Sequence, residues 1–133
     1  MKFLLDTQAM LWLFAEPKKI NPRIRTKLAH PENPVFVSAV STWEVSVKIS
    51  IGKLTLPDGQ DPGIYLPNSI RRAGLTTIPI SPEHTYGVSS LAQHHGDPFD
   101  RLLISQAKIE GLTIVTSDRI VAKYDVESIL ISS

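Results

Sequence analysis

The sequence has no cysteine among its 133 residues, so it can form neither a disulfide framework nor a thiolate zinc site. This fits a reducing compartment and favours a cytoplasmic location. No apolar run approaches the roughly 18 residues of a membrane span, so we expect no membrane association. Neither sign of charge dominates: 14 Lys and Arg stand against 13 Asp and Glu, a formal net charge of +1. Composition therefore predicts a soluble globular protein and does not by itself indicate a nucleic-acid partner.

The sequence also lacks internal repeats, low-complexity tracts and long linkers, so we expect residues 1–133 to form a single domain. A chain of this length can bury about two-thirds of its unfolded surface without a disulfide or structural metal. Its first residues resemble a short secretory leader, but Asp6 interrupts the apolar run and Ala15-Glu16-Pro17 is a poor cleavage site. We therefore expect these residues to belong to the fold.

Short apolar segments alternate with helical patterns along the whole chain. Strands are expected at 2–5, 35–37, 76–80 (a weak one, at an edge), 112–116 and 128–131. Helices are expected at 8–14, 22–29, 41–52, 82–93, 98–110 and 118–123, with a broken helical stretch ending near residue 73 after the loop 56–63. This order is typical of an α/β fold in which helices cover both faces of an open parallel sheet. Ligands of such sheets bind at the carboxyl ends of the strands.

Four acidic residues are candidates for that edge. Asp6 ends the first strand, Asp118 follows the fourth, and Glu44 lies in the expected first turn after the second. Asp100 lies in the first turn of the helix 98–110 and joins the others only if that helix starts at the same edge. We expect these four side chains to converge.

Each acid also fits an ordinary structural role. Glu44 has the spacing of a capping-box partner for Ser41, which is also why we expect a helix at 41–52 in spite of its alternating pattern. Asp100 is a favourable charge at a helix N-terminus, and Asp118 is a possible cap. Asp6 stands between two apolar runs, where an unpartnered charge is costly. The convergence, rather than any one residue, favours a site.

Clustered carboxylates repel one another, and burial favours their protonated forms unless cations compensate. All-oxygen ligands suit Mg²⁺ or Mn²⁺. Such an ion lowers the pKa of a bound water and offsets charge on a leaving oxygen, which suits phosphodiester hydrolysis. We therefore expect catalysis, and the binding of one or two Mg²⁺ (or Mn²⁺) ions, by Asp6, Glu44, Asp100 and Asp118.

The residues that carry these acids resemble the PIN domains, and among them the VapC-type toxin nucleases of type II toxin-antitoxin pairs. The resemblance covers essentially the whole chain and lies in four short motifs: Leu4-Leu5-Asp6-Thr7, Ser41-Thr42-Trp43-Glu44, the segment 97–104 and Val115-Thr116-Ser117-Asp118. It implies a five-stranded parallel sheet, dependence on Mg²⁺ or Mn²⁺, and endonucleolytic cleavage of RNA. It also implies inhibition by a cognate antitoxin protein whose tail covers the acidic site.

The resemblance assigns supporting roles to three hydroxyl residues, Thr7, Thr116 and Ser117, which ordinary strand and cap chemistry also explains. Asp97 competes with Asp100 for the third ligand position. Asp97 is better explained as the cap of a helix whose first residue is Pro98, so we assign the ligand to Asp100.

Basic residues give weaker indications. The stretch Lys18 to Lys27 has five cations and no acid, and it is either a phosphate-binding rim or, more commonly, a solvated helix face. Arg101 and Arg119 flank two predicted ligands and are candidates for contact with RNA, or for pairing with a site carboxylate. The four histidines show no zinc-binding spacing, and we expect His94 and His95 to contact solvent more readily than RNA.

The sequence is also compatible with two other functions. A receiver-like signalling module would be phosphorylated on a strand-end Asp, but it needs an acidic pair where this chain has only Asp6. A PIN-like fold without catalysis would serve only in binding. A homodimer or antitoxin groove is a further possibility at Trp12, Leu13 and Phe14, which are otherwise core residues.

Overall fold

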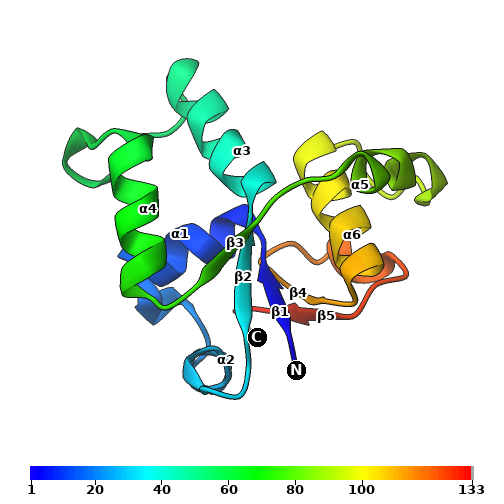
Figure 1. Cartoon of the computed structure of the whole chain (residues 1–133), viewed down its shortest axis with the longest axis horizontal. Coiled ribbons are helices and arrows are strands. Elements are labelled where there is room, and N and C mark those ends of the chain that lie inside the picture. Colours follow the sequence, from blue (N-terminus) through cyan, green and yellow to red (C-terminus); the bar gives the residue numbers. More distant parts are fainter. Residues whose placement is uncertain (133) are drawn as a thin grey trace.

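A computed structural model, describing residues 1–132, contains one five-stranded sheet with the strand order β3-β2-β1-β4-β5 (Figure 1). All four strand pairs are parallel. The strands are β1 (Phe3–Leu5), β2 (Val35–Ser38), β3 (Thr76–Ile78), β4 (Thr113–Thr116) and β5 (Ser128–Leu130). The predicted open parallel sheet and the edge position of β3 are therefore confirmed.

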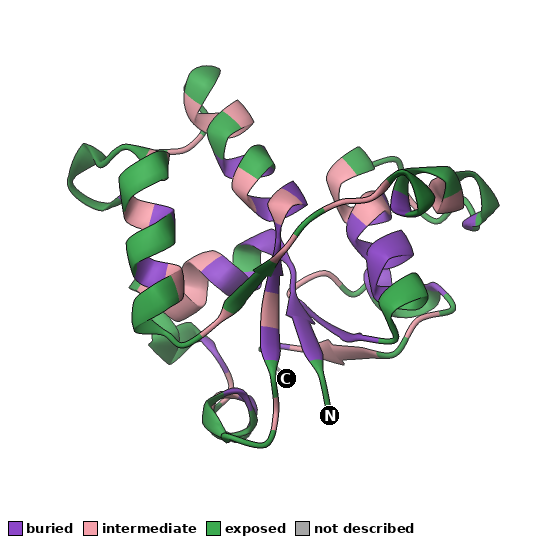
Figure 2. Ribbon diagram, viewed as in Figure 1, coloured by how far each residue is buried: buried purple, intermediate pink, exposed green. Residues whose placement is uncertain are grey.

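Alternate residues of β1 face two separate cores, because successive side chains of a strand point to opposite faces. Phe3 and Leu5 pack with α1 (Thr7–Ala15) and α2 (Pro22–Ala29) in one apolar cluster. Leu4 packs in the other cluster with α6 (Pro98–Glu110). The central strands are buried, and the outer surfaces of the helices are exposed (Figure 2). Helices thus cover both faces of the sheet.

The remaining elements connect these layers. They are the helices α3 (Ala39–Ser50), α4 (Pro62–Arg72) and α5 (Pro82–Gly87), and the 3₁₀ turns η1 (Pro17–Lys19), η2 (Pro57–Gly59), η3 (Val88–Ser90) and η4 (Val121–Lys123). Trp12, Leu13 and Phe14 of α1 are half-buried and pack against the core, as their assignment to the core predicted.

The expected start of α3 is wrong. Ser38, the last residue of β2, caps the helix by accepting a hydrogen bond from the Val40 N–H (3.0 Å), so the helix begins at Ala39 rather than near Ser41. Glu44 then lies in the second turn and cannot complete a capping box. The capping-box role therefore does not explain why an acidic residue stands at position 44.

Three other predicted helices change their extent. The stretch before residue 73 is the continuous helix α4, and the segment after Asp118 forms only the 3₁₀ turn η4. The helix expected at 82–93 ends at Gly87, because side chains of α6 donate hydrogen bonds to main-chain carbonyls of this segment. The Ser105 hydroxyl donates to the His84 carbonyl (2.6 Å), and Arg101 Nη2 donates to that of Val88 (3.2 Å).

Helix α6 begins at the carboxyl edge of the sheet and returns across one face. Asp97 caps it, Pro98 is its first residue, and Gly111 ends it in the left-handed conformation (φ 68°). This direction brings the first turn of α6 to the same edge as the ends of β1 and β4.

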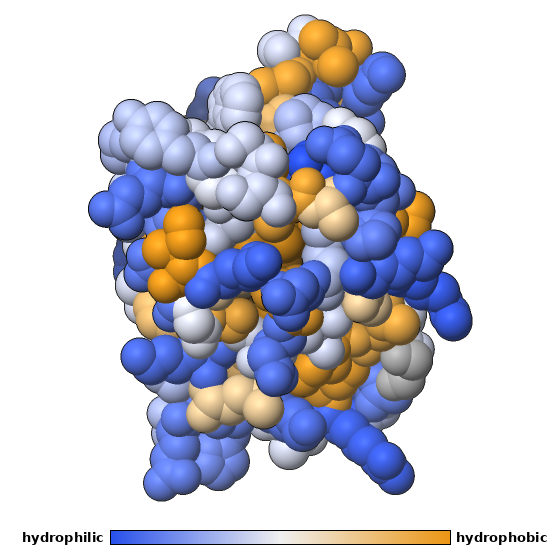
Figure 3. All heavy atoms as spheres, turned by 90° about the vertical axis from the view of Figure 1, so that its right-hand side faces the viewer, coloured by the Kyte–Doolittle hydropathy of each residue, from blue (hydrophilic) through white to orange (hydrophobic). Residues whose placement is uncertain are grey.

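None of the helices in residues 1–132 combines the length and apolar composition that a bilayer crossing requires. On the face shown in Figure 3, hydrophobic side chains appear as separate groups among hydrophilic ones.

Candidate active site

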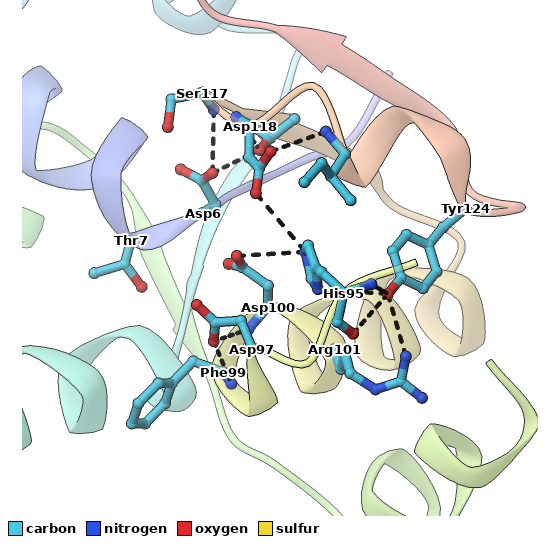
Figure 4. A network of polar contacts seen from close by, with 12 residues as sticks. Asp6, Thr7, His95, Asp97, Phe99, Asp100, Arg101, Ser117, Asp118 and Tyr124 are labelled. Atoms are coloured by element: carbon cyan, nitrogen blue, oxygen red, sulfur yellow. Dashed lines mark hydrogen bonds and ion pairs between the residues drawn. The ribbon is translucent and has the colours of Figure 1, made fainter. Parts of the chain in front are cut away.

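The four predicted acids line one cleft of about 310 Å³ at the carboxyl edge of the sheet. Asp6 follows β1, Glu44 projects from α3, Asp100 from the first turn of α6, and Asp118 lies just after β4. Figure 4 shows Asp6, Asp100 and Asp118 pointing into the same space. The structure therefore brings together all four residues singled out in the sequence.

Asp6 is held by three hydrogen bonds. Oδ1 accepts from the Ala9 N–H (2.7 Å), which makes Asp6 the cap of α1. Oδ2 accepts from the Thr116 hydroxyl (2.7 Å) and the Ser117 N–H (3.1 Å). Burial nevertheless raises the pKa of Asp6, and the nearby Glu44 adds to the rise, because these bonds only partly offset desolvation.

Glu44 is buried and is held from two sides. The Thr7 hydroxyl donates to Oε1 (2.5 Å), and Lys48 Nζ lies 2.6 Å from Oε2 as an ion pair across one helical turn. The ion pair raises the pKa of Lys48. Each carboxylate oxygen of Glu44 thus faces one of these two partners.

Asp118 is oriented by the chain on both sides of it. Its N–H donates to Thr116 Oγ1 (3.0 Å), and its Oδ1 accepts from the Ile120 N–H (2.8 Å). The Thr116 hydroxyl therefore contacts both Asp6 and the backbone of Asp118. Oδ2 of Asp118 remains directed into the cleft.

Asp100 lies among like charges in the first turn of α6. Desolvation, followed by the charges of Asp97, Asp6, Glu44 and Asp118, raises its pKa to about 7. Asp97 instead uses its Oδ1 to accept from the N–H groups of Phe99 (2.9 Å) and Asp100 (3.2 Å), as a helix cap does. The assignment of Asp97 to capping is confirmed.

This donor set fits a divalent cation. The four carboxylates repel one another, and the raised pKa values of Asp6 and Asp100 show that the fixed cations around them do not balance their charge. Ligand atoms of Asp100, Asp118 and His95 lie within 4.8 Å of one another. A small dication is the ordinary solution for such a cluster.

His95 is the site residue that sequence reasoning missed. It lies in the loop before α6, and its Nε2 is 3.8 Å from Asp100 Oδ2 and 3.7 Å from Asp118 Oδ2. The predicted solvent contact is wrong, since its side chain is only 13% exposed. Its position next to the segment 97–104 was the available signal.

The prediction that Arg101 contacts RNA is contradicted by its burial. Its guanidinium turns inward and donates to the carbonyls of Ala92 (2.8 Å) and Val88 (3.2 Å) and to the Tyr124 hydroxyl (3.1 Å). Arg119 is exposed, so its contact with RNA stays a prediction.

Replacing Arg101 by Met is expected to lower the free energy of unfolding by about 2 to 4 kcal/mol, because one buried and two partly buried acceptors lose a charged donor. Arg119→Met, on the surface, is expected to change it by less than about 0.5 kcal/mol. Urea unfolding followed by circular dichroism measures both. Equal stability of the two variants would contradict the structural role of Arg101.

One curated relative is the ribonuclease VapC16 of Mycobacterium tuberculosis, with 35% identity over 54 residues. This alignment covers 41% of the present chain and 36% of VapC16, so the chain spans only about a third of the relative's length.

Solved structures share the fold at low sequence identity. A chain of VapBC2 from Rickettsia felis, solved with a DNA fragment from its promoter, is 18% identical with a TM-score of 0.73, over 97% of this chain and 98% of that one. A chain of DNA-bound VapBC from Salmonella typhimurium is 17% identical with a TM-score of 0.64, over 97% of each chain. The PIN domain family model matches residues 3–127, and the chain therefore belongs to the PIN domain family.

Proposed function

We propose that this protein is a metal-dependent endoribonuclease that hydrolyses RNA phosphodiester bonds, and that it is the toxin of a type II toxin-antitoxin pair. The observation that carries the proposal is the convergence of Asp6, Glu44, Asp100 and Asp118 in one cleft of a PIN-family chain. The ribonuclease name of VapC16 and the VapBC names of the structural neighbours support it. Membership of this family replaces the receiver-like alternative.

The four acids are the proposed catalytic residues and metal ligands. Three of them are held by hydrogen bonds: Thr116 and Ser117 orient Asp6, Thr7 orients Glu44, and the Ile120 N–H orients Asp118. A bound Mg²⁺ or Mn²⁺ would activate water and offset the negative charge that develops on the phosphate. The three hydroxyl residues are thus proposed to position ligands rather than to react.

Cations beside the cleft would receive the RNA backbone. Lys48 and Lys53 line the cleft itself, and exposed Arg119 follows Asp118. The predicted basic stretch Lys18 to Lys27 lies on η1 and α2, apart from the elements that form the cleft. We therefore assign RNA phosphates first to the lysines of the cleft.

A cognate antitoxin that covers the acidic cleft, a homodimeric assembly and a cytoplasmic location complete the proposal. The VapBC complexes among the structural neighbours support the antitoxin. The protein should therefore be purified free of any antitoxin before activity is measured.

The test is cleavage of labelled RNA by the purified chain with Mg²⁺, with Mn²⁺ and with EDTA. We expect cleavage with either ion, products that include internal cuts, and loss of activity in EDTA that returns when the metal is restored. Undiminished cleavage in EDTA would overturn the metal dependence. RNA binding without cleavage under every metal condition would instead support the inactive binding module.

A further inference from the structure

His95 places a nitrogen atom among the carboxylates of the cleft. In Figure 4 its ring stands between Asp100 and Asp118, and it comes from the loop that leads into α6. Nε2 lies 3.8 Å from one carboxylate oxygen and 3.7 Å from the other. The site is therefore not composed of oxygen ligands alone.

These distances are too long for hydrogen bonds, because a nitrogen–oxygen separation of about 3.6 Å or more is outside hydrogen-bond range. Nε2 is nevertheless buried, and it has no hydrogen-bond partner. A buried polar atom without a partner costs about 1 to 3 kcal/mol, so its retention here calls for an explanation. An ion between the imidazole and the two carboxylates would satisfy all three groups.

The spacing of the three ligand atoms suits such an ion. Adjacent ligands at about 2.0 to 2.2 Å from a metal lie about 3 to 3.6 Å from one another in octahedral or tetrahedral geometry. The separations of 3.7 and 3.8 Å are slightly longer than that range. Only small shifts are needed for joint coordination.

Tyr124 contacts both the main chain and the ring of His95. The main-chain N–H of His95 donates to Tyr124 Oη (3.2 Å), and the ring nitrogen Nδ1 lies 3.4 Å from the same oxygen. Arg101 fixes that hydroxyl from the protein interior (3.1 Å). A proton on Nδ1 directed at Tyr124 leaves the Nε2 lone pair facing the carboxylates, the arrangement that metal-binding histidines usually have.

We propose that His95 Nε2, with Asp100 and Asp118, is a ligand of the metal in this cleft and gives the site a preference for Mn²⁺ over Mg²⁺. The inference rests on the proposed metal-dependent function and concerns the identity of its ligands. Mg²⁺ favours oxygen ligands, whereas imidazole nitrogen suits transition metals, whose affinities rise along the first row from Mn²⁺.

The direct test is pulsed electron paramagnetic resonance of Mn²⁺ added to the purified chain. Nitrogen bound to Mn²⁺ gives a hyperfine coupling, and labelling the histidines with ¹⁵N assigns that coupling to imidazole. We expect the histidine coupling in the wild type and in His94→Ala, the matched control from the adjacent position. We expect its loss in His95→Ala and in His95→Asn, which supplies an oxygen of similar reach.

Metal affinities provide the second readout. Calorimetric titration should show that His95→Ala weakens Mn²⁺ binding by at least about tenfold and weakens Mg²⁺ binding less. The ratio of the Mn²⁺ affinity to the Mg²⁺ affinity should therefore fall. Bound Mn²⁺ without histidine coupling in the wild type, or with a coupling that persists in His95→Ala, would overturn the inference and leave the acidic metal site standing. Failure of the wild type to bind either ion would overturn both the inference and the metal dependence of the proposed function.

Discussion

Asp6→Asn is expected to slow RNA cleavage by more than about 100-fold while the protein stays folded. Groups that merely orient a metal ligand typically contribute 10- to 100-fold to metal affinity or activity, and Asp6 is a proposed ligand itself. Asn keeps the oxygen that caps α1. It removes the buried charge, whose desolvation raises the pKa of Asp6, so the loss of the Thr116 and Ser117 bonds is partly offset in stability.

The matched control is Asp61→Asn, the same substitution at another helix cap. Asp61 accepts from the Gly63 N–H (2.7 Å) at the start of α4, away from the cleft. Both variants should show wild-type circular dichroism, and Asp61→Asn should also keep wild-type activity. Cleavage by Asp6→Asn at the rate of the wild type would remove Asp6 from the catalytic residues.

Thr116→Val separates ligand positioning from ligation. The substitution preserves the shape of a fully buried side chain but removes the hydroxyl that donates to Asp6 and accepts from Asp118. We expect Thr116→Val to slow RNA cleavage more than Asp61→Asn does and less than Asp6→Asn does. The metal affinity should fall together with the cleavage rate.

The fold could largely be predicted because its signals are local. Apolar runs of three to five residues define the strands, and the Asp97-Pro98 start and Gly111 end define α6 without reference to the rest of the chain. The errors lie where distant residues decide. Helix α5 stops at Gly87 because side chains of α6 donate hydrogen bonds to the carbonyls of His84 and Val88. The residues of the segment 82–93 do not predict those contacts.

The acidic residues of the site were predictable for a similar reason, since strand ends of a parallel sheet meet at one edge. His95 and Arg101 were not. The direction of the Arg101 side chain depends on how α6 is rotated about its axis, and that of His95 depends on the conformation of the preceding loop. Packing with the rest of the chain decides both, so the sequence places these residues near the site but does not predict where their side chains point. Arg101 turns to the interior and His95 into the cleft, the reverse of what we expected for both.

Asp100→Asn is expected to stabilise the metal-free protein at pH 8 although it destroys a proposed ligand. The pKa of Asp100 is about 7 in the folded protein, against an ordinary value of 3.8 for an aspartate side chain, because burial and four neighbouring acids oppose its charge. Between these values the folded state holds a proton that the unfolded state has released. The free energy of unfolding therefore falls as pH rises through this window, and the loss is complete above pH 7.

The Asn variant has no such proton and should escape this loss. A difference of about three pH units corresponds to about 4 kcal/mol, and removing a charge that favours the α6 N-terminus costs about 0.3 to 1 kcal/mol. We therefore expect Asp100→Asn to be more stable than wild type by about 3 to 4 kcal/mol at pH 8 in EDTA, and no more stable at pH 3.5.

Urea unfolding at both pH values measures this difference, with Asp125→Asn as an exposed control whose stability should follow the wild type. Mn²⁺ should reverse the order, since an ion that binds the folded wild type offsets the repulsion around Asp100, whereas the variant has lost that ligand. Equal stability of wild type and Asp100→Asn at pH 8 in EDTA would mean that the four carboxylates do not repel one another as their geometry requires. The same charges that destabilise the metal-free protein are thus the source of the affinity of the cleft for a dication.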